Sequence, residues 1–486
     1  MHATLLKPRE WAQLEFALAN LGDARRTKRL VQIGSALVQC PSGTLPEAFP
    51  DWAELKGAYR FFSNPNINYE KISGPHWQRT HQSCTEPGEY LLIDDTTDLD
   101  YSSHPRCRGL GQIGNQYGRG LWLHSTLAVR VDAWDLKHCA EVTVVGVAGQ
   151  KCWARTGPSR RKQKERWRQR LRRQRESQRW AQTLEQMPVR PAKATWIYVA
   201  DRESDIYEAF ERCGQRQIDF IIRAQYDRTL AQEDRSLFEA VAQAPVLGCF
   251  EVEVRKRPER RARTAKVEVR VVPVTLKGVW RPGGERPALT LNVIEAREVD
   301  GPADEEPIHW VLLTNLPAKR FVEARRIVAR YAKRWVIEEF HKALKSGANV
   351  EKSELETAER LQALVAVLVV VAVRLVNTKL LARTHPEQLV DVEAFGREAL
   401  QILSARFGEP EGGWKYGGVL IAIARMGGFL ARRNDGDPGW VTIWRGWQRL
   451  MRMSEGILSL RKKSRARREE KDVGNDKAFT PLRCPM

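Results

Sequence analysis

Apolar residues recur at helical spacing from Trp11 to about Ser73, which predicts a small helical domain at the start of the chain. Within it, the stretch LGDARRTKRL gathers basic side chains within about one helical turn of each other. These side chains are Arg25, Arg26, Lys28 and Arg29. The first domain is therefore expected to be helical and basic.

Short β-rich runs begin near Glu89 and are separated by glycine and polar turns. YLLIDDTT, GLWLHSTLAVRV and HCAEVTVVGVAG predict three neighbouring strands. Farther along, ATWIYVADRESDIYEAFERC and QIDFIIRA have the pattern of a strand, a helix and a strand. This alternation is typical of an α/β core with parallel strand pairing.

From Ser236 to about Thr314, apolar and polar residues alternate in four runs joined by Pro, Gly and charged turns, which predicts an antiparallel β insertion. After Pro317, AKRFVEARRIVARYAKRWVIEEFHKALKSG predicts one long helix ending at Gly347. ERLQALVAVLVVVAVRLV predicts a second helix, and a helical region rich in tryptophan follows. The last segment, RKKSRARREEK, is a charge run that is expected to be disordered.

The composition favours a soluble protein that binds a polyanion. The 486 residues are 42% hydrophobic, which is enough for packed cores, and the net charge of +20 favours nucleic acid over acidic metabolites as the partner. The cysteines show no CxxC pair and no metal-ligand spacing with His, which indicates a reducing compartment. No signal peptide is apparent, and the longest apolar run, Ala363 to Val373, is shorter than the ~20 residues of a membrane span. We therefore expect an intracellular protein.

Three acidic residues follow buried strands. Asp94 and Asp95 end the apolar run YLLI, and Asp201 ends WIYVA. Ligands gather at the carboxyl ends of strands in α/β proteins, which makes these residues candidates for an active site. The alternative is that each aspartate begins a turn or caps a helix.

The long helix adds a glutamate with basic neighbours. At ~100° per residue, Tyr331, Arg334, Glu338 and Lys345 fall within an arc of roughly 60°, whereas Glu339 points about 80° away from Tyr331. A surface pair between Arg334 and Glu338 would explain only those two residues. Two aspartates at strand ends and a glutamate on a helix suit a two-metal site for phosphoryl transfer, with the basic residues on the phosphates.

Together, IDDTT, ADRESDI and YAKRWVIEEFHKALKSG resemble the signature of the cut-and-paste DDE transposases of the bacterial Tn-five type, in the IS-four superfamily. LGDARRTKRL, GAYRFFSNPN, RGLWLHSTL, IHWVLLTNLP, VAVRL and AIARMGGFL are similar to other blocks of that family in the same order. The resemblance covers the chain from about residue 10 to 450.

The resemblance implies an α/β fold with a ribonuclease-H-like core, a mixed sheet flanked by helices. Asp95, Asp201 and Glu338 would be catalytic and would hold two Mg²⁺, with Asp95 bridging and Mn²⁺ expected to substitute. Asp95 is preferred over Asp94 because the family's first carboxylate immediately precedes the threonine pair. The role of Asp94 stays open.

The resemblance also implies contacts with DNA. Tyr331, Arg334 and Lys345 would contact phosphates near the cleavage site, and Trp310 would stack on a base flipped out during hairpin formation. Arg223 matches a DNA-contacting arginine. The alternatives are a core-facing strand tryptophan at 310 and an ordinary surface arginine at 223.

The resemblance also implies a reaction in several steps. The protein would nick one strand, form and open a DNA hairpin, and join the 3′-OH to target DNA. The protein would act as a homodimer on double-stranded DNA, at terminal inverted repeats and at the target, in the bacterial cytoplasm, associated with the nucleoid and without a membrane. Arg25, Arg26 and Arg29 are the candidates for end recognition. The rival hypotheses are a catalytically silent DNA-binding repressor of transposition and a stand-alone metal-dependent nuclease.

This interpretation divides the chain into consecutive parts. They are an N-terminal helical end-binding domain (1–73), the first part of the catalytic core (74–235), the β insertion (236–314), the second part of the core with the Glu338 helix (315–375), a C-terminal helical dimerisation region (376–460) and a basic tail (461–486). The basic segment 151–190 is expected to be a helix or a mobile arm.

Overall fold

A computed structural model gives the structure of the chain. It describes residues 7–457, except for 42–43, 115–116, 135–139, 156–177, 232–233, 255–260, 282–283, 433–434 and 455. Most of the basic segment 151–190 and the whole tail 461–486 lie outside the described residues, so the expectations for them stay predictions.

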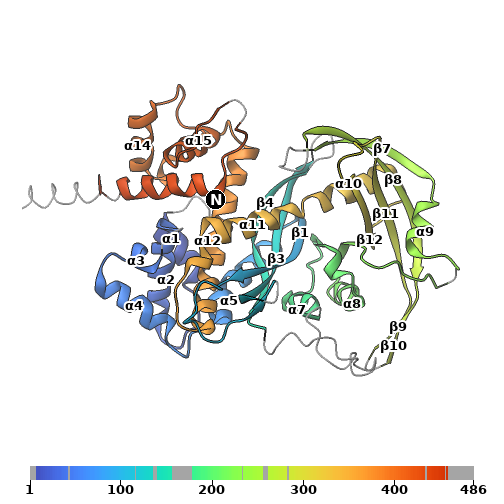
Figure 1. Ribbon diagram of the computed structural model, residues 1–486, viewed down its shortest axis with the longest axis horizontal. Helices are drawn as coiled ribbons and strands as arrows, with labels where there is room; N and C mark the ends of the chain where they lie inside the picture. Colours follow the sequence, from blue (N-terminus) through green and yellow to red (C-terminus); the bar gives the residue numbers. More distant parts are fainter. Residues whose placement is uncertain are drawn as a thin grey trace, which may run out of the picture.

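The centre of the molecule is a ten-stranded mixed sheet with the order β2-β3-β1-β5-β6-β12-β11-β8-β7, in which β4 pairs with β3. It runs through the middle and one end of the molecule in Figure 1. The strands are β1 (Gly88–Asp100), β2 (Gly111–Ile113), β3 (Gly118–Trp134), β4 (Ala140–Trp153), β5 (Ala194–Ala200), β6 (Asp219–Arg223), β7 (Val246–Val254), β8 (Arg263–Leu276), β11 (Leu289–Val299) and β12 (His309–Thr314). A separate small hairpin pairs β9 (Val279–Arg281) with β10 (Gly284–Arg286).

The predicted parallel pairing is confirmed, because β1 pairs with β5 and β5 pairs with β6 in parallel. The central strands β1 and β5 are buried on both faces, which explains the continuous apolar runs YLLI and WIYVA. Leu91 and Ile93 belong to one hydrophobic core, whereas Tyr90 and Leu92 belong to a second core. Successive strand residues thus serve opposite faces.

The predicted β insertion is antiparallel, but it is continuous with the core sheet. β12 pairs antiparallel with β6, with Leu312 opposite Arg223, and β11, β8 and β7 follow in turn. Without β12, the edge of β6 would expose unpaired backbone groups, so the insertion covers this edge and lengthens the same sheet.

Helices gather at the other end of the molecule, where the N-terminal and C-terminal helices lie together (Figure 1). The N-terminal helices are α1 (Pro8–Phe16), α2 (Ala24–Gln39), α3 (Leu45–Ala48), α4 (Trp52–Phe62) and α5 (Tyr69–Ser83). The expected boundary at residue 73 falls inside α5. His76 on this helix accepts a hydrogen bond from the backbone N–H of Val147 on β4 (3.0 Å), so α5 packs on the sheet.

The expectation of one continuous helix to Gly347 is wrong at two points. The chain forms α10 (Phe321–Ala332), α11 (Trp335–Lys342) and a π-helical turn, η3 (Ala343–Gly347). Between α10 and α11, the N–H of Arg334 bonds to the carbonyl of Tyr331 (2.9 Å) and that of Ile337 to Arg334 (3.2 Å). These tighter i→i−3 bonds interrupt the α-helical ladder.

The remaining helices of the core lie between its strands in the sequence or follow the sheet. α7 (Gln178–Gln186), the 3₁₀ turn η2 (Arg202–Ser204), α8 (Tyr207–Gln215) and α9 (Leu237–Ala242) connect strands, and η4 (Val350–Lys352) precedes α12 (Ala358–Thr384). Among the described residues, α12 is the one helix long and apolar enough to cross a membrane, but 83% of its most apolar window is buried inside the protein. Such burial is typical of a core helix.

The C-terminal region is helical, as predicted. It comprises α13 (Val392–Phe395), α14 (Arg397–Phe407), α15 (Tyr416–Met426) and a helix over residues 440–454. The last two helices cross at glycines. A Cβ on Gly446 would lie 1.6 Å from the carbonyl oxygen of Ile423, and one on Gly427 would lie 1.8 Å from that of Thr442.

Candidate active site

Asp95 and Asp201 lie side by side at the centre of the sheet. β1 and β5 are parallel, and their register pairs Asp94 with Ala200. Asp95 follows Asp94 and Asp201 follows Ala200, so the two aspartates leave the sheet at the same level. Neighbouring strands lie about 5 Å apart, which brings the two residues close together. Asp95 and Asp201 therefore lie at the ends of adjacent strands, as the apolar runs before them predict.

The proximity of these two carboxylates affects the protonation of Asp95. Burial and the negative charge of Asp201 raise the pKa of Asp95 to about 7, although Arg334 and the backbone N–H of Thr96 act in the opposite direction. Two carboxylates that repel each other in a partly buried site favour a cation beside them.

Arg334 joins the third carboxylate to the pair. Its Nη1 lies 3.4 Å from Oδ2 of Asp95, and its Nη2 donates to Oε1 of Glu338 at 2.6 Å. Arg334 thus bridges Asp95 and Glu338, and the charge of Asp201 also acts on it. In the described part of the chain, no three His, Cys, Asp or Glu side chains stand in an arrangement that could hold a metal ion. Glu338 is instead paired with Arg334.

The donor set suits a hard divalent cation. Carboxylate oxygens are the ligands that Mg²⁺ and Mn²⁺ prefer, and Arg334 shows that a positive group fits between Asp95 and Glu338. A cation bound to Asp95 would also relieve its repulsion with Asp201. Release of Arg334 from the two carboxylates would leave all three acidic side chains available as ligands.

The predicted aromatic and basic neighbours form one cluster beside the carboxylates. The rings of Trp310 and Tyr331 meet edge to face, with centroids 5.0 Å apart. Arg223 donates from Nη2 to the carbonyl of His309 (2.9 Å), and it also hydrogen-bonds to the side chain of Tyr331. Trp310 is partly buried and packs against one of the hydrophobic cores, and Arg223 is partly exposed, so their contacts with DNA stay predictions.

Lys345 lies farther from the centre than the helix arithmetic implies. Its Nζ pairs with Oδ1 of Asp98 at 2.9 Å and lies 3.6 Å from Glu351. The arithmetic assumed one straight helix, whereas the π-helical turn η3 displaces Lys345 from the face of α11. Lys345 nevertheless stays next to β1, because its partner Asp98 is only three residues beyond Asp95 on that strand.

Glu339 has a separate role in packing. Its Oε2 accepts hydrogen bonds from Nζ of Lys379 on α12 (2.9 Å) and from Nε1 of Trp440 (3.2 Å). Burial alone would raise the pKa of Glu339, but the hydrogen bond and charge of Lys379 outweigh it and lower the pKa. The two adjacent glutamates therefore face different partners.

One residue beside the site escaped the sequence analysis. His341 on α11 is buried, and its Nδ1 lies 4.0 Å from Oδ2 of Asp95. Burial lowers the pKa of His341 to about 3, with smaller contributions from Lys345, His124 and Arg334, so its ring is neutral at pH 7. Its place in EEFHK, within the helical motif, was the available signal.

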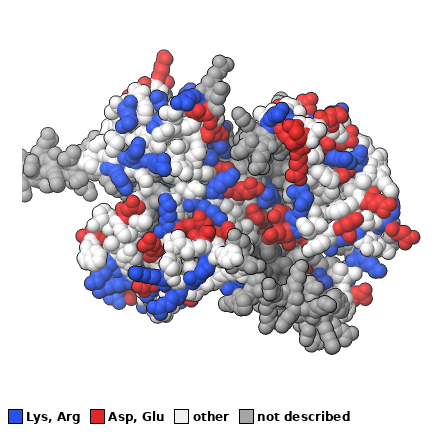
Figure 2. Space-filling view, viewed as in Figure 1, with Lys and Arg blue, Asp and Glu red and all other residues white. Residues whose placement is uncertain are grey.

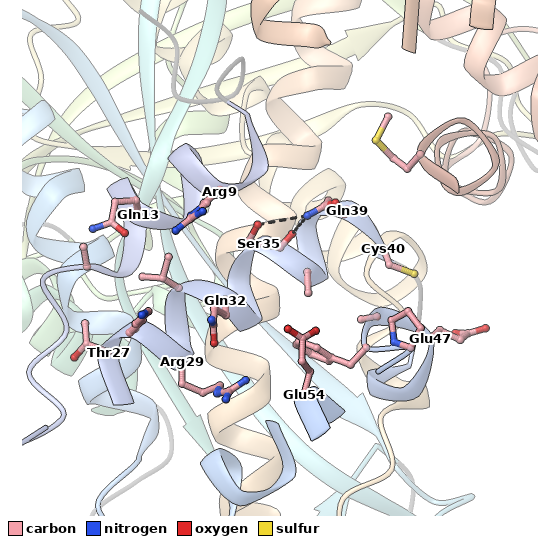
Figure 3. Close-up of a pocket in the computed structure, with 18 of the residues that line it drawn as sticks. Arg9, Gln13, Thr27, Arg29, Gln32, Ser35, Gln39, Cys40, Glu47 and Glu54 are labelled. Atoms are coloured by element: carbon pink, nitrogen blue, oxygen red, sulfur yellow. Dashed lines mark hydrogen bonds between the residues drawn. The ribbon is translucent and has the colours of Figure 1, made fainter. Parts of the chain in front are cut away.

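The three arginines predicted to recognise DNA ends lie on α2. Arg25 pairs with Asp23 and is 92% exposed, whereas Arg26 donates to the carbonyl of Leu21 (2.9 Å). Arg29 packs against Gly57 and lines a cavity of about 740 Å³ beside α1, α2 and α3, shown in Figure 3. Figure 2 shows basic side chains spread over the N-terminal helices and acidic ones gathered near the middle of the same face.

Two parts of the chain match models of known protein families. Residues 8–67 match the family model described as Transposase DNA-binding, and residues 160–373 match the one described as Transposase DDE domain. These domains support a DDE transposase. The first match spans α1 to α4, where the predicted end-recognition arginines lie, and supports binding to DNA. The second match contains Asp201 and Glu338, begins after Asp95, and supports an enzyme that acts on DNA.

Proposed function

We propose that this DNA transposase moves an insertion sequence by a cut-and-paste reaction of the Tn-five type, in the IS-four superfamily. It would bind terminal inverted repeats through the N-terminal helices, cleave each end, and join the ends to target DNA in the bacterial cytoplasm. The observation that carries the proposal is the placement of Asp95 beside Asp201 at the ends of two parallel strands, with Arg334 bridging Asp95 to Glu338 on the helix beside them.

The core of the sheet supports a ribonuclease-H-like assignment. Its strand order β4-β3-β1-β5-β6 joins three antiparallel strands to two parallel ones, with helices on both faces. In this proposal the extension through β12 to β7 is an addition to that core, and it brings Trp310 to the site.

Asp95, Asp201 and Glu338 would hold two divalent cations, with Asp95 shared. When bound, the cations would activate the attacking oxygen and stabilise the leaving oxygen. Arg334, once separated from its carboxylates, would grip a phosphate, and Tyr331 and Lys345 would contact neighbouring phosphates. Arg223, which bonds to Tyr331, would contact DNA at the edge of this cluster.

Each chemical step would exchange one P–O bond for another. Water would attack the first strand and free a 3′-OH, and this 3′-OH would attack the opposite strand to form a hairpin. Water would then open the hairpin, and the regenerated 3′-OH would attack target DNA. The C-terminal helices would pair two subunits during the reaction.

The reaction itself tests the proposal. The protein would be incubated with Mg²⁺ and a labelled fragment carrying its own terminal repeat, and the products would be separated on a denaturing gel. Hairpin-ended fragments are expected. Simple nicks without hairpins would instead support a stand-alone nuclease, and a retarded but uncut fragment would support a silent repressor.

Replacing Trp310 with alanine is expected to slow hairpin formation about tenfold more than the first nick. The partly buried indole offers a stacking face for an extruded base, worth on the order of 1–3 kcal/mol. Single-turnover rates for the two steps would measure the difference. Equal slowing of both steps would indicate that Trp310 acts only by packing against Tyr331.

A further inference from the structure

Asp94, which the catalytic motif leaves without a role, is the centre of a buried polar network. Its carboxylate is almost completely inaccessible to solvent. Oδ1 accepts a hydrogen bond from Thr126 at 2.6 Å, and Oδ2 accepts one from Tyr198 at 2.7 Å. Nε2 of His124 lies 3.0 Å from the same Oδ2. Three strands, β1, β3 and β5, therefore meet at one carboxylate.

Two branches lead away from Asp94. The single hydroxyl proton of Tyr198 goes to Asp94, so the hydroxyl of Ser204, 3.1 Å away, must donate to Tyr198. On the other branch, His124 lies between Asp94 and Thr96, because its Nδ1 is 2.9 Å from the hydroxyl of Thr96. Nε2 of the same ring also lies 3.3 Å from the hydroxyl of Thr183.

Both ends of the network reach residues next to the predicted metal ligands. Thr96 follows Asp95, and its backbone N–H donates to Oδ1 of Asp95 at 2.9 Å. Ser204 ends η2, the turn that Asp201 caps by accepting a hydrogen bond from the N–H of Glu203 (2.9 Å). One branch therefore holds the residue after Asp95, and the other branch holds the turn that presents Asp201.

The position of Asp94 in the strand explains why it acts from behind the site. Successive strand side chains point to opposite faces, so Asp94 faces away from the face on which Asp95 meets Arg334. A buried carboxylate is costly unless it is fully hydrogen-bonded, and apolar side chains of similar size would stabilise a core equally well. A saturated buried network instead restricts the geometry of the groups around it.

We propose that Asp94 is a positioning residue, which acts through Tyr198–Ser204 and His124–Thr96 to fix the separation of the Asp95 and Asp201 carboxylates for divalent cations. The inference rests on the proposed function of these carboxylates as metal ligands. In this proposal Asp94 touches neither DNA nor metal. Instead, hydrogen bonds on the opposite face of the sheet fix the positions of the two carboxylates.

Tyr198→Phe tests the proposal because it removes one hydroxyl and both of its hydrogen bonds while keeping the packed ring. The matched control is Tyr90→Phe, another buried strand tyrosine, whose hydroxyl donates to the backbone carbonyls of Ser83 and Glu86 at the other end of β1. The full chain without DNA would be titrated with Mn²⁺ by calorimetry, and thermal unfolding and end cleavage would be measured in parallel.

The expected result is an affinity for Mn²⁺ about 10-fold weaker in Tyr198→Phe than in Tyr90→Phe. This is the low end of the roughly 10- to 100-fold range for loss of a direct hydrogen-bond partner of a metal ligand, because Tyr198 reaches Asp201 only through Ser204 and η2. Cleavage by Tyr198→Phe should recover at high Mn²⁺, a rescue that a purely structural defect would not show. Asp94→Asn, which keeps one carbonyl acceptor, should fall between the wild type and Tyr198→Phe.

Two results would overturn the inference. One is equal Mn²⁺ affinity in Tyr198→Phe and Tyr90→Phe, and the other is a loss of cleavage that no concentration of Mn²⁺ restores. Failure of the proposed function has a different signature, because a wild-type protein that binds Mn²⁺ but never cuts DNA still allows the affinities to be compared. A wild-type protein that binds no Mn²⁺ would overturn both proposals.

Discussion

Replacing Glu338 with alanine is expected to abolish strand cleavage, with a loss of at least about 10³-fold, while binding to the terminal repeat stays intact. Asp95→Ala and Asp201→Ala should behave in the same way. Each change removes a carboxylate proposed to hold the cations that stabilise the transition state, a contribution of several kcal/mol. Cleavage assays in Mg²⁺, with gel retardation of the same DNA, would measure both properties.

The neighbouring glutamate provides the control. Glu339→Ala should leave cleavage at low temperature largely intact but reduce stability by roughly 3 kcal/mol, because it strands the buried ammonium of Lys379. Glu338→Ala should change stability much less, since Arg334 keeps Asp95 as a partner. Appreciable cutting by any of the three carboxylate variants would contradict the assignment of the site.

Replacing Gly446 with alanine is expected to reduce stability by roughly 3 kcal/mol, as much as Glu339→Ala. The added methyl group would meet the backbone carbonyl of Ile423 at 1.6 Å, and backbone cannot yield without separating α15 from the helix over 440–454. Urea denaturation, monitored by tryptophan fluorescence, to which Trp440, Trp444 and Trp447 of this helix contribute, would measure the change.

Gly439→Ala is the matched substitution for Gly446→Ala. It lies just before the same helix and has nothing within 4 Å of its Cβ position. Its stability should stay within about 0.5 kcal/mol of the wild type. Equal denaturation midpoints for Gly446→Ala and the wild type would show that the two helices do not cross as closely as described.

Much of the core could be predicted because its signals are local. The apolar runs before Asp95 and Asp201 are continuous since both faces of the central strands are buried, and strands of this kind pair in parallel. Once β1 and β5 are adjacent and in register, the two aspartates must come together. The helical spacing from Arg334 to Glu338 likewise survives, as their salt bridge shows.

The rest depended on contacts between distant segments. The pairing of β12 with β6, which turns an insertion into part of the core sheet, leaves no trace in either strand alone. The break before Trp335 and the π-helical turn around Lys345 lie in a segment that packs against β1 and α12, and such contacts between distant segments are not visible in a local pattern. The network around Asp94 was invisible for the same reason, since its partners come from β3, β5 and η2.

The central claim is that Asp95, Asp201 and Glu338 together hold divalent cations at a scissile phosphate. The most direct test is a crystal structure of the protein bound to a terminal DNA end in Mn²⁺, with the ions located by anomalous scattering. The account predicts two Mn²⁺ ions per active site, with Asp95 shared between them and Arg334 moved onto a DNA phosphate. DNA in place with Arg334 still bridging Asp95 and Glu338, and no Mn²⁺ on any of the three carboxylates, would contradict it.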